Sequence, residues 1–379
     1  MYQRNKRATS IAAFLLAAFQ IVADPLDHWT LGNVGAPVVL RAVTYGNGQF
    51  VAVGDAGAIF TSPDGAVWTP RQSGTSNTIL TICYGKGLFV AGDGNPSSSQ
   101  ADWGVLTSRD GSNWTRTRYP TWGFITSVVF GQNRFVAATR WAAAVSEDGV
   151  HWTDLFIPGW ASMIGYGQNL FIAASDTTLI STNGIDWTFA SGTTRLLQSV
   201  TYGNGIFVGT DRNSGTPGDV VTTTNGVWTH WPNTGTIYGF GSVAFAHDTF
   251  VLAGDTGVIF TSKTGTNWTE RVPGMFYDLG LAYVAYGNGV VMIVGAQGVV
   301  LQSDHYGPPI ARISKPAALG RSVVRVSVSA EKEKICTLQG SADLENWVDL
   351  HSYTNYDGLA EFDEPSGTNA TGFYRAVTE

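Results

Sequence analysis

Four aspartates stand at matching places in the chain, each just after a short apolar run that begins with phenylalanine: Asp55, Asp93, Asp211 and Asp255. Paired carboxylates can cleave a glycosidic bond when they flank it roughly 5–9.5 Å apart, one of them acting as the general acid. If the fold brings these aspartates to one face, a glycoside hydrolase is one candidate function.

Tryptophans and arginines in similar loop positions favour recognition instead. Aromatic rings stack on sugars and peptides, while charged groups fix the orientation of the ligand. Rings of this kind can also wedge neighbouring structural units together, which is the alternative for each of them. The candidate ligand-binding set, in which we predict no catalytic residue, is Asp55, Asp93, Trp103, Trp122, Arg140, Trp141, Trp160, Asp211, Arg212 and Asp255.

A repeated turn provides the framework that must position these side chains. The chain has the sequence Ser-x-Asp/Asn-Gly-x-x-Trp-Thr, or a near variant, in copies that end at Trp68, Trp114, Trp152, Trp187, Trp228 and Trp268. We call these copies the tryptophan turns. A repeat of roughly 40 residues built from short strands is typical of β-propeller blades.

A second motif, Tyr/Phe-Gly-x-Gly/Asn-x-Phe-Val or a variant of it, starts at Tyr45, Tyr84, Phe130, Tyr166, Tyr202, Phe245 and Tyr286. Four short β-branched or aromatic runs, cut by Gly, Asn and Asp, make up one unit and predict four antiparallel strands. The seventh unit lacks its tryptophan, and Trp29 near the other end of the chain supplies it. We therefore predict an all-β fold, a seven-bladed β-propeller closed by an N-terminal strand.

Propeller geometry decides where the candidate set lies. The loops between second and third strands, and the connections between blades, open on one face, opposite the tryptophan turns. The aspartates and arginines come from the first kind of loop, and Trp122 and Trp160 from the second. A long insertion, 94–102, brings Trp103 beside them. We name this side the loop-rich face and predict the ligand site there.

The polar residues of the tryptophan turns have a simpler explanation. Asx side chains bond their own backbone in turns, and the tryptophan packs between blades. Because the pattern recurs in six blades, we predict a shared structural role rather than a catalytic centre for Asp64, Asp110, Asp148, Asn183 and Asn225.

Composition excludes several classes of function. The net charge is −7, only 13% of residues are charged, and Lys86 and Lys263 are the lysines of the predicted propeller. A basic footprint for nucleic acid is therefore absent. The six histidines show no metal-ligand spacing. We predict no metal, no cofactor and no nucleic-acid partner.

Residues 1–23 are typical of a secretory signal, with three basic residues before an apolar run at 11–22. About 12 apolar residues are too few to span a bilayer core of about 30 Å. We expect a secreted, periplasmic or cell-surface protein with no membrane span in the mature chain, and an uncleaved anchor is the alternative.

Gly307-Pro308-Pro309 marks a domain boundary, because consecutive prolines favour an extended connector. The propeller is predicted to occupy residues 24–307. Alternating apolar runs in residues 308–379 predict a small β-sandwich of the fibronectin-III type.

The repeat resembles the Asp-box, or BNR-type, propellers of sialidases, oligoxyloglucan-cleaving glycosidases and photosystem assembly factors. The resemblance covers residues 27–304 and rests on Ser62–Trp68 and its relatives, which are one residue shorter than the usual Asp box, Ser-x-Asp-x-Gly-x-x-Trp. The segment 337–347, with Phe373-Tyr374-Arg375, resembles sandwich domains that end many exported proteins of Verrucomicrobia-like bacteria.

Sialidase chemistry, which this resemblance would suggest, needs a Tyr/Glu nucleophile pair near an arginine triad. The glutamates of the propeller, Glu147 and Glu270, lie in or beside tryptophan turns. We therefore favour an exported, non-catalytic recognition or scaffold protein, monomeric, that binds a glycan or an extracellular protein on the loop-rich face. The alternative is a glycoside hydrolase that uses paired aspartates on that face.

Overall fold

The computed structural model describes most of residues 24–306 and the strands of the segment that follows. The described residues are 24–94, 102–118, 123–139, 142–174, 177–190, 197–211, 219–231, 240–254, 257–272, 280–281, 283–306, 312–313, 317–318, 323–329, 334–341, 348–355, 359–365 and 373–378. The predicted signal at 1–23 lies outside them.

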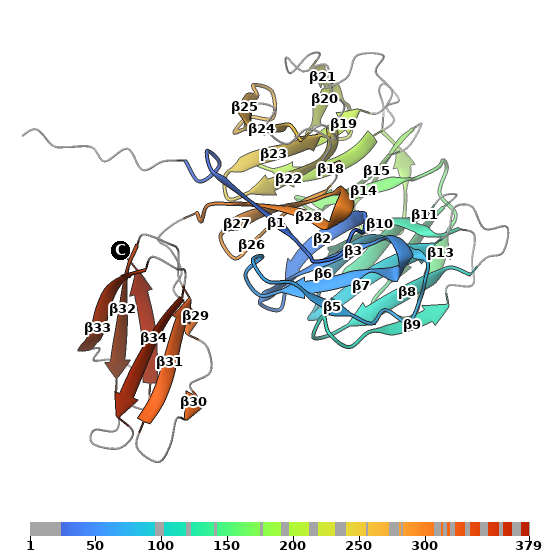
Figure 1. Cartoon of the computed structure of the whole chain (residues 1–379). Coiled ribbons are helices and arrows are strands. Elements are labelled where there is room, and N and C mark those ends of the chain that lie inside the picture. The colour runs from blue at the N-terminus through green and yellow to red at the C-terminus, as the bar shows by residue number, and fades with distance from the viewer. Residues whose placement is uncertain are drawn as a thin grey trace, which may run out of the picture.

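Seven four-stranded antiparallel sheets follow one another along the chain as the blades of a β-propeller (Figure 1). The first strand of each blade packs against the first strands of its two neighbours. Blades 1 to 3 are β2 (Leu40–Gly46), β3 (Gln49–Gly54), β4 (Ile59–Ser62), β5 (Thr69–Arg71); β6 (Thr78–Gly85), β7 (Leu88–Gly94), β8 (Gly104–Ser108), β9 (Thr115–Arg118); and β10 (Ile125–Gly131), β11 (Arg134–Thr139), β12 (Ala143–Ser146), β13 (Thr153–Leu155).

Blades 4 to 6 repeat this order. They are β14 (Met163–Gly167), β15 (Leu170–Ala174), β16 (Thr178–Ser181), β17 (Thr188–Phe189); β18 (Leu197–Gly203), β19 (Ile206–Asp211), β20 (Val220–Thr223), β21 (Thr229–Trp231); and β22 (Phe240–Ala246), β23 (Thr249–Gly254), β24 (Ile259–Ser262), β25 (Thr269–Val272). The predicted all-β, seven-bladed architecture is therefore confirmed.

Blade 7 joins the two ends of the ring. It consists of β26 (Tyr283–Gly287), β27 (Val290–Val294), β28 (Val299–Ser303) and the N-terminal strand β1 (Trp29–Asn33). Figure 1 shows β1, in blue, beside the orange β28, and the two pair antiparallel with Trp29 opposite Ser303. The indole of Trp29 donates to the Leu26 carbonyl over 2.9 Å, as Trp68 does to Gly65 over 2.8 Å in blade 1. The N-terminal strand thus supplies the missing tryptophan.

A glycine at the end of the first strand sets how closely neighbouring blades approach. The aromatic ring of the next blade lies over this glycine, so that a Cβ atom at Gly46 or Gly167 would be closer than 3.0 Å to carbons of Tyr84 or Tyr202. The same contact occurs at Gly85, Gly131, Gly203 and Gly287. The last of these receives Tyr45 of blade 1, so the contact also joins blade 7 to blade 1.

In blades 1 to 6 each ring is also held by a phenylalanine of its own blade. Tyr202 packs on the buried Phe207, with ring centroids 4.9 Å apart. In blade 6 the glycine is replaced by Ala246. The corresponding ring of blade 7, Tyr286, makes an edge contact with Tyr306 there, at a centroid distance of 5.8 Å.

The tryptophan turns satisfy their own polar groups. In blade 2 the Asp110 carboxylate accepts hydrogen bonds from the N–H groups of Ser112 and Asn113 at 2.9 and 2.8 Å, and from Asn113 Nδ2 at 2.7 Å. These bonds, those from Asn113 first, hold the pKa of Asp110 well below its usual range. The Trp114 indole donates to the Gly111 carbonyl over 2.7 Å.

Blades 3 and 4 build the same turn with different side chains. His151 donates its backbone N–H to Asp148 over 2.8 Å, and its ring Nδ1 lies 2.7 Å from the carboxylate. Both contacts lower the pKa of Asp148. In blade 4, Asn183 Oδ1 accepts from the N–H groups of Ile185 and Asp186, each over 2.9 Å. An amide replaces the carboxylate here, which agrees with the structural role predicted for these residues.

Hairpins between first and second strands contact the tryptophan turn of the next blade. Asn47 Nδ2 donates to the Arg109 carbonyl over 3.2 Å, and Asn204 Nδ2 donates to the Lys263 carbonyl over 2.9 Å. Both kinds of turn therefore lie on one face, the tryptophan-turn face. The loops between second and third strands lie on the opposite, loop-rich face.

The C-terminal segment forms two antiparallel sheets. One contains β29 (Arg312–Ile313), β30 (Ala317–Ala318), β31 (Val323–Ser329) and β34 (Leu359–Pro365). The other has the order β33 (Val348–Asn355), β32 (Lys334–Ser341), β35 (Phe373–Thr378). Two such sheets are compatible with the small β-sandwich predicted for this segment.

Substitution of Gly167 by alanine should lower the free energy of unfolding by about 1–3 kcal/mol, the usual range for overpacking a close contact. Where the site has room for a methyl group, Gly→Ala stabilises a protein by about 0.4–1 kcal/mol, because it reduces the conformational entropy of the unfolded chain. The steric clash with Tyr202 should outweigh this gain. The Tyr202 ring cannot yield freely, because it stacks on Phe207 and its hydroxyl donates to Gln168 over 3.0 Å. Urea denaturation measures the change.

The double variant Gly167→Ala/Tyr202→Leu is the control for that experiment. Removing the ring should relieve the clash, so the double variant should be more stable than the sum of the two single changes implies. Additive effects would mean that the glycine does not set the spacing between blades.

Replacing Asp110 and Asp148 by asparagine should make the protein less sensitive to acid. A carboxyl whose pKa is lowered by folding contributes stability above its unfolded-state pKa of about 3.9, and this contribution is lost as the pH falls below that value. Asparagine keeps the acceptor, as Asn183 does, without titrating. The melting temperature at pH 7 should fall slightly, because the charge-dependent part of this contribution is lost, and its decrease between about pH 5 and pH 2 should be smaller than in the wild type.

The matched control is Asp110→Ala, which removes the acceptor and should lower the melting temperature at pH 7 as well. An equal acid response in the asparagine variant and the wild type would contradict the role assigned to the two turns.

Candidate ligand-binding face

Asp55 lies on the loop-rich face, where the sequence places it. It begins the short 3-10 turn η1 (Asp55–Gly57) after β3. Arg41 donates Nε and Nη2 to the two carboxylate oxygens of Asp55, each over 2.9 Å, and this fork raises the pKa of Arg41. The two side chains are 42% and 31% exposed. Asp55 therefore presents a charged pair to a ligand rather than a free carboxylate.

Asp93 does not present its carboxylate at this face, although we expected it there. Its side chain is fully buried at the end of β7. It accepts hydrogen bonds from the Gly104 N–H over 2.6 Å and from Arg116 Nε over 2.6 Å. Burial requires such partners for a charged group, and Arg116 on the outer strand β9 supplies them. We correct the candidate set by removing Asp93 as a ligand contact.

Trp103 behaves as a wedge. Its ring is only partly exposed and packs edge-on against the buried Phe124, at a centroid distance of 6.2 Å. Its indole nitrogen is buried and makes no hydrogen bond. Trp103 thus packs against the connection from blade 2 to blade 3, which is the structural role given above as the alternative for each aromatic ring.

Trp160 is exposed, as a ligand platform requires. It precedes β14 on the connection from blade 3 to blade 4, and 53% of its surface is accessible. Of the other predicted site residues, Asp211 ends β19 opposite Leu197. The remaining ones, Trp122, Arg140, Trp141, Arg212 and Asp255, lie outside the described residues.

Three other exposed aromatic rings lie at the ends of outer strands. Phe156 follows β13, Phe189 ends β17 and Trp231 ends β21, each at the end of the strand directed to the loop-rich face. Their exposures are 105%, 56% and 38%. Among the described residues, these three and Trp160 are the large aromatic side chains that are exposed. We did not single out Phe156 or Phe189 from the sequence, because the two-residue and three-residue outer strands give little pattern.

An aspartate–histidine pair on blade 5 was also missed. Asp219 is buried before β20, and its carboxylate lies 2.5 Å from Nε2 of His230 on β21. The histidine side chain is 30% exposed. The two positions are adjacent only once the pairing of Val221 with His230 is known, so sequence spacing alone gave no signal.

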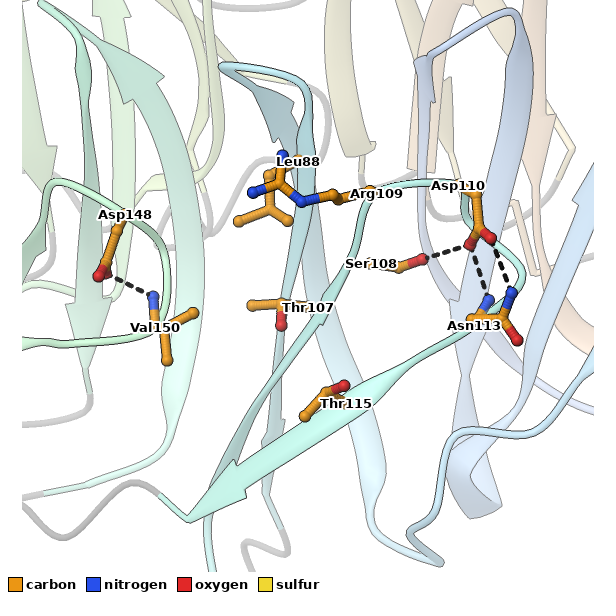
Figure 2. Close-up of a pocket in the computed structure, with 9 residues that line it drawn as sticks. All are labelled: Leu88, Thr107, Ser108, Arg109, Asp110, Asn113, Thr115, Asp148 and Val150. Atoms are coloured by element: carbon orange, nitrogen blue, oxygen red, sulfur yellow. Dashed lines mark hydrogen bonds between the residues drawn. The ribbon is translucent and has the colours of Figure 1, made fainter.

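A pocket of about 490 Å³ lies on the tryptophan-turn side, between blades 2 and 3 (Figure 2). Its walls are Leu88, Thr107, Ser108, Arg109, Asp110, Asn113 and Thr115 of blade 2 with Asp148 and Val150 of blade 3. Figure 2 shows the hydrogen bonds that engage Asp110 and Asp148 within their own turns. Because both pKa values are lowered, neither carboxylate can act as a proton donor near neutral pH. The pocket therefore suits binding rather than acid catalysis.

The described part of the chain lacks two further features. No group of three or more His, Cys, Asp or Glu side chains is arranged to hold a metal ion. No helix among those residues has the length and apolar content to cross a membrane.

Comparison with known proteins gives the fold but no family. No protein-family model matches the chain, and no curated protein matches it. Solved structures do. YCF48 bound to a D1 peptide superimposes with a TM-score of 0.59 at 14% identity, covering 76% of this chain and 99% of that one. YCF48 from Cyanidioschyzon merolae gives 0.58 at 20% identity, covering 73% and 98%.

Virginiamycin B lyase from Staphylococcus aureus has the same architecture, with a TM-score of 0.61 at 11% identity and coverage of 74% of this chain and all of that chain. All three identities are low, so these likenesses establish the β-propeller alone. They confirm the seven-bladed fold expected from the repeat.

Proposed function

We propose that this protein is an exported, non-catalytic recognition or scaffold protein that binds a glycan or an extracellular protein on its loop-rich face. Export rests on the signal-like residues 1–23. Binding on this face rests on one observation: the exposed large aromatic rings of the described residues, Phe156, Trp160, Phe189 and Trp231, all lie at its edge.

Exposed rings of this size are costly to leave in water without a purpose. Burying a large aromatic side chain contributes about 1.5–3 kcal/mol, and patches of such rings mark interaction sites on soluble proteins. The ring of Phe189 lies near the connection from blade 3 to blade 4, because a Cβ atom at Gly159 would be 3.7 Å from it, and Trp160 is the next residue of that connection.

Polar groups on the same face can orient a ligand. The fork between Arg41 and Asp55 is accessible on blade 1, and the Asp219–His230 pair is partly accessible on blade 5. Apolar rings with a few polar groups are typical of sites for sugars and peptides. The uniform turns on the opposite face carry no comparable aromatic side chain among the described residues.

The solved structures are compatible with this proposal. One YCF48 structure contains a D1 peptide, and one virginiamycin B lyase structure contains Quinupristin. Propellers of this shape thus serve both binding and catalysis. The choice between them for this chain has to come from its own side chains.

A glycoside hydrolase is the second candidate, on the basis of aspartates on the loop-rich face. The described side chains weaken it. Asp93 is buried with its oxygens bonded to Gly104 and Arg116, and Asp55 is bonded to Arg41. A hydrolase would have to rely on Asp211 and Asp255. Loss of activity in an Asp211→Asn/Asp255→Asn variant that still binds its sugar would favour this second function.

Trp160→Ala should weaken ligand binding without destabilising the protein. Exposed aromatic hot spots cost about 2 kcal/mol or more on truncation, roughly thirty-fold in affinity. The purified chain from residue 24 would be applied to a glycan array and to a peptide array. The best ligand from either array would then be titrated into the wild type, Trp160→Ala and Phe189→Ala by calorimetry.

The matched control is Val67→Ala, which truncates a 71% exposed apolar side chain on the tryptophan-turn face. Binding should remain unchanged in that variant, and all three variants should melt within a few degrees of the wild type. Unchanged affinity in both aromatic variants would place the site elsewhere and contradict the proposal.

A further inference from the structure

In three blades, the side chain at one position of the outer strand occupies the same space beside the third strand. It lies three residues after the turn tryptophan, and its side-chain N–H donates to a threonine hydroxyl on the third strand. The pairs are Arg71 Nε with Thr61 at 2.9 Å in blade 1, Trp231 Nε1 with Thr222 at 2.9 Å in blade 5, and Arg271 Nε with Thr261 at 2.8 Å in blade 6. We call this space the outer slot.

Blade 6 shows what else surrounds the outer slot. The Arg271 guanidinium continues to the turn of the next blade, where Nη2 donates to Asp24 over 2.8 Å and Nη1 donates to Asp27 over 2.5 Å. The side chain is 22% exposed. A guanidinium thus bridges a hydroxyl of its own blade and carboxylates of the next.

Blade 2 has the threonine but no side chain to fill the slot. Thr107 pairs with Thr115 as Thr61 pairs with Thr69 in blade 1, so it is the matching threonine. The position of Arg71 and Arg271 is taken by Thr117, which is short and exposed. The pocket of about 490 Å³ in Figure 2 lies beside this position, and Thr107 and Thr115, but not Thr117, line it.

Carboxylates remain at the far side of this pocket. Counting back from each tryptophan, Glu147 matches Asp24 and Val150 matches Asp27, while Asp148 lines the pocket. Asp110 and Asp148 stay ionised because their turns lower both pKa values.

Arg109 is the one cation of the pocket wall. Its counterpart Lys263 in blade 6 pairs with Asp248 over 2.9 Å, whereas the matching residue near Arg109 is Gly87. The lining carries two carboxylates, Asp110 and Asp148, and one cation, so the pocket has a net negative charge. Next to it, the charges of Glu147 and Lys86 offset each other, and Lys86 Nζ donates to the Glu147 carbonyl over 3.3 Å.

We propose that the outer slot of blade 2 binds an arginine side chain of a partner polypeptide. The guanidinium Nε donates to the Thr107 hydroxyl, and its other N–H groups reach the carboxylates of the blade 3 turn, as Arg271 does within the chain. The aliphatic part of the arginine lies along Leu88 and Val150. This pocket lies between the tryptophan turns of blades 2 and 3, and it shares no residue with the proposed recognition site.

Arginine fits better than the other occupants that the chain suggests. Trp231 shows that an indole can enter the slot of blade 5, but an indole offers one donor and no charge. Lysine carries the charge without the planar fork that donates to hydroxyl and carboxylate together. The carboxylates therefore favour arginine.

N-acetyl-arginine N-methylamide is the probe for this site, and methyl NMR of the leucine- and valine-labelled protein is the readout. Leu88 and Val150 should shift on titration, with a dissociation constant on the order of 1 mM. The lysine and tryptophan amides should bind at least five-fold more weakly. Thr117→Arg, which supplies the missing side chain, should abolish the shifts.

Thr107→Val and Thr107→Ser are the matched pair. The valine variant keeps the shape without the acceptor and should weaken binding about five- to ten-fold, while the serine variant should bind as the wild type does. The proposal is overturned if the Leu88 and Val150 signals do not move, if the lysine or tryptophan amide binds as tightly, or if Thr117→Arg leaves the titration unchanged in a folded protein.

Discussion

The close contact between a glycine and the aromatic ring of the next blade governs this structure. At Gly46, Gly167 and Gly287 the absent side chain is replaced by a ring, so each blade meets its neighbour at a fixed distance. This contact occurs at six of the seven junctions, and Ala246 stands at the seventh. All seven spacings together have to close a circle, and an error at one blade would accumulate around it. Protein interiors are packed too densely to absorb it. The closed circle of blades therefore fixes the positions of the inner strands, and differences between blades have to occur farther from the central axis.

The two faces follow from that constraint. The tryptophan turns and the hairpins brace one blade against the next through bonds such as Asn47 to Arg109, so their sequences repeat. The loops on the other face do not hold neighbouring blades together, so their sequences can differ from blade to blade. The exposed Trp160 and the Arg41–Asp55 pair are found there. Function in a repeat protein is therefore expected where the repeats differ, and the outer slot of blade 2 is one such difference outside the loop-rich face.

Much of the fold could be predicted from the sequence, because period, turn chemistry and the displaced tryptophan at position 29 are all local signals. The site was harder. Asp93 looked like Asp55 in sequence, but its burial depends on Arg116, which lies on a different strand and outside any repeated motif. The open slot beside Thr107 could be identified only from the strand register, which matches Thr117 with Arg71. Side-chain exposure at short outer strands, as at Phe189, has no periodic signature at all.

Closure by β1 has a consequence for the order of events during synthesis. Trp29 pairs with Ser303, so β1 has no partner until the last blade has been made. Contacts between such distant segments form slowly, since a long loop has to close first. During that time the residues around Trp29 stay unpaired in a chain that emerges N-terminus first, and β28 would present an open edge once it forms. We expect such a protein to need a holding factor during synthesis more than a propeller closed within one hairpin would.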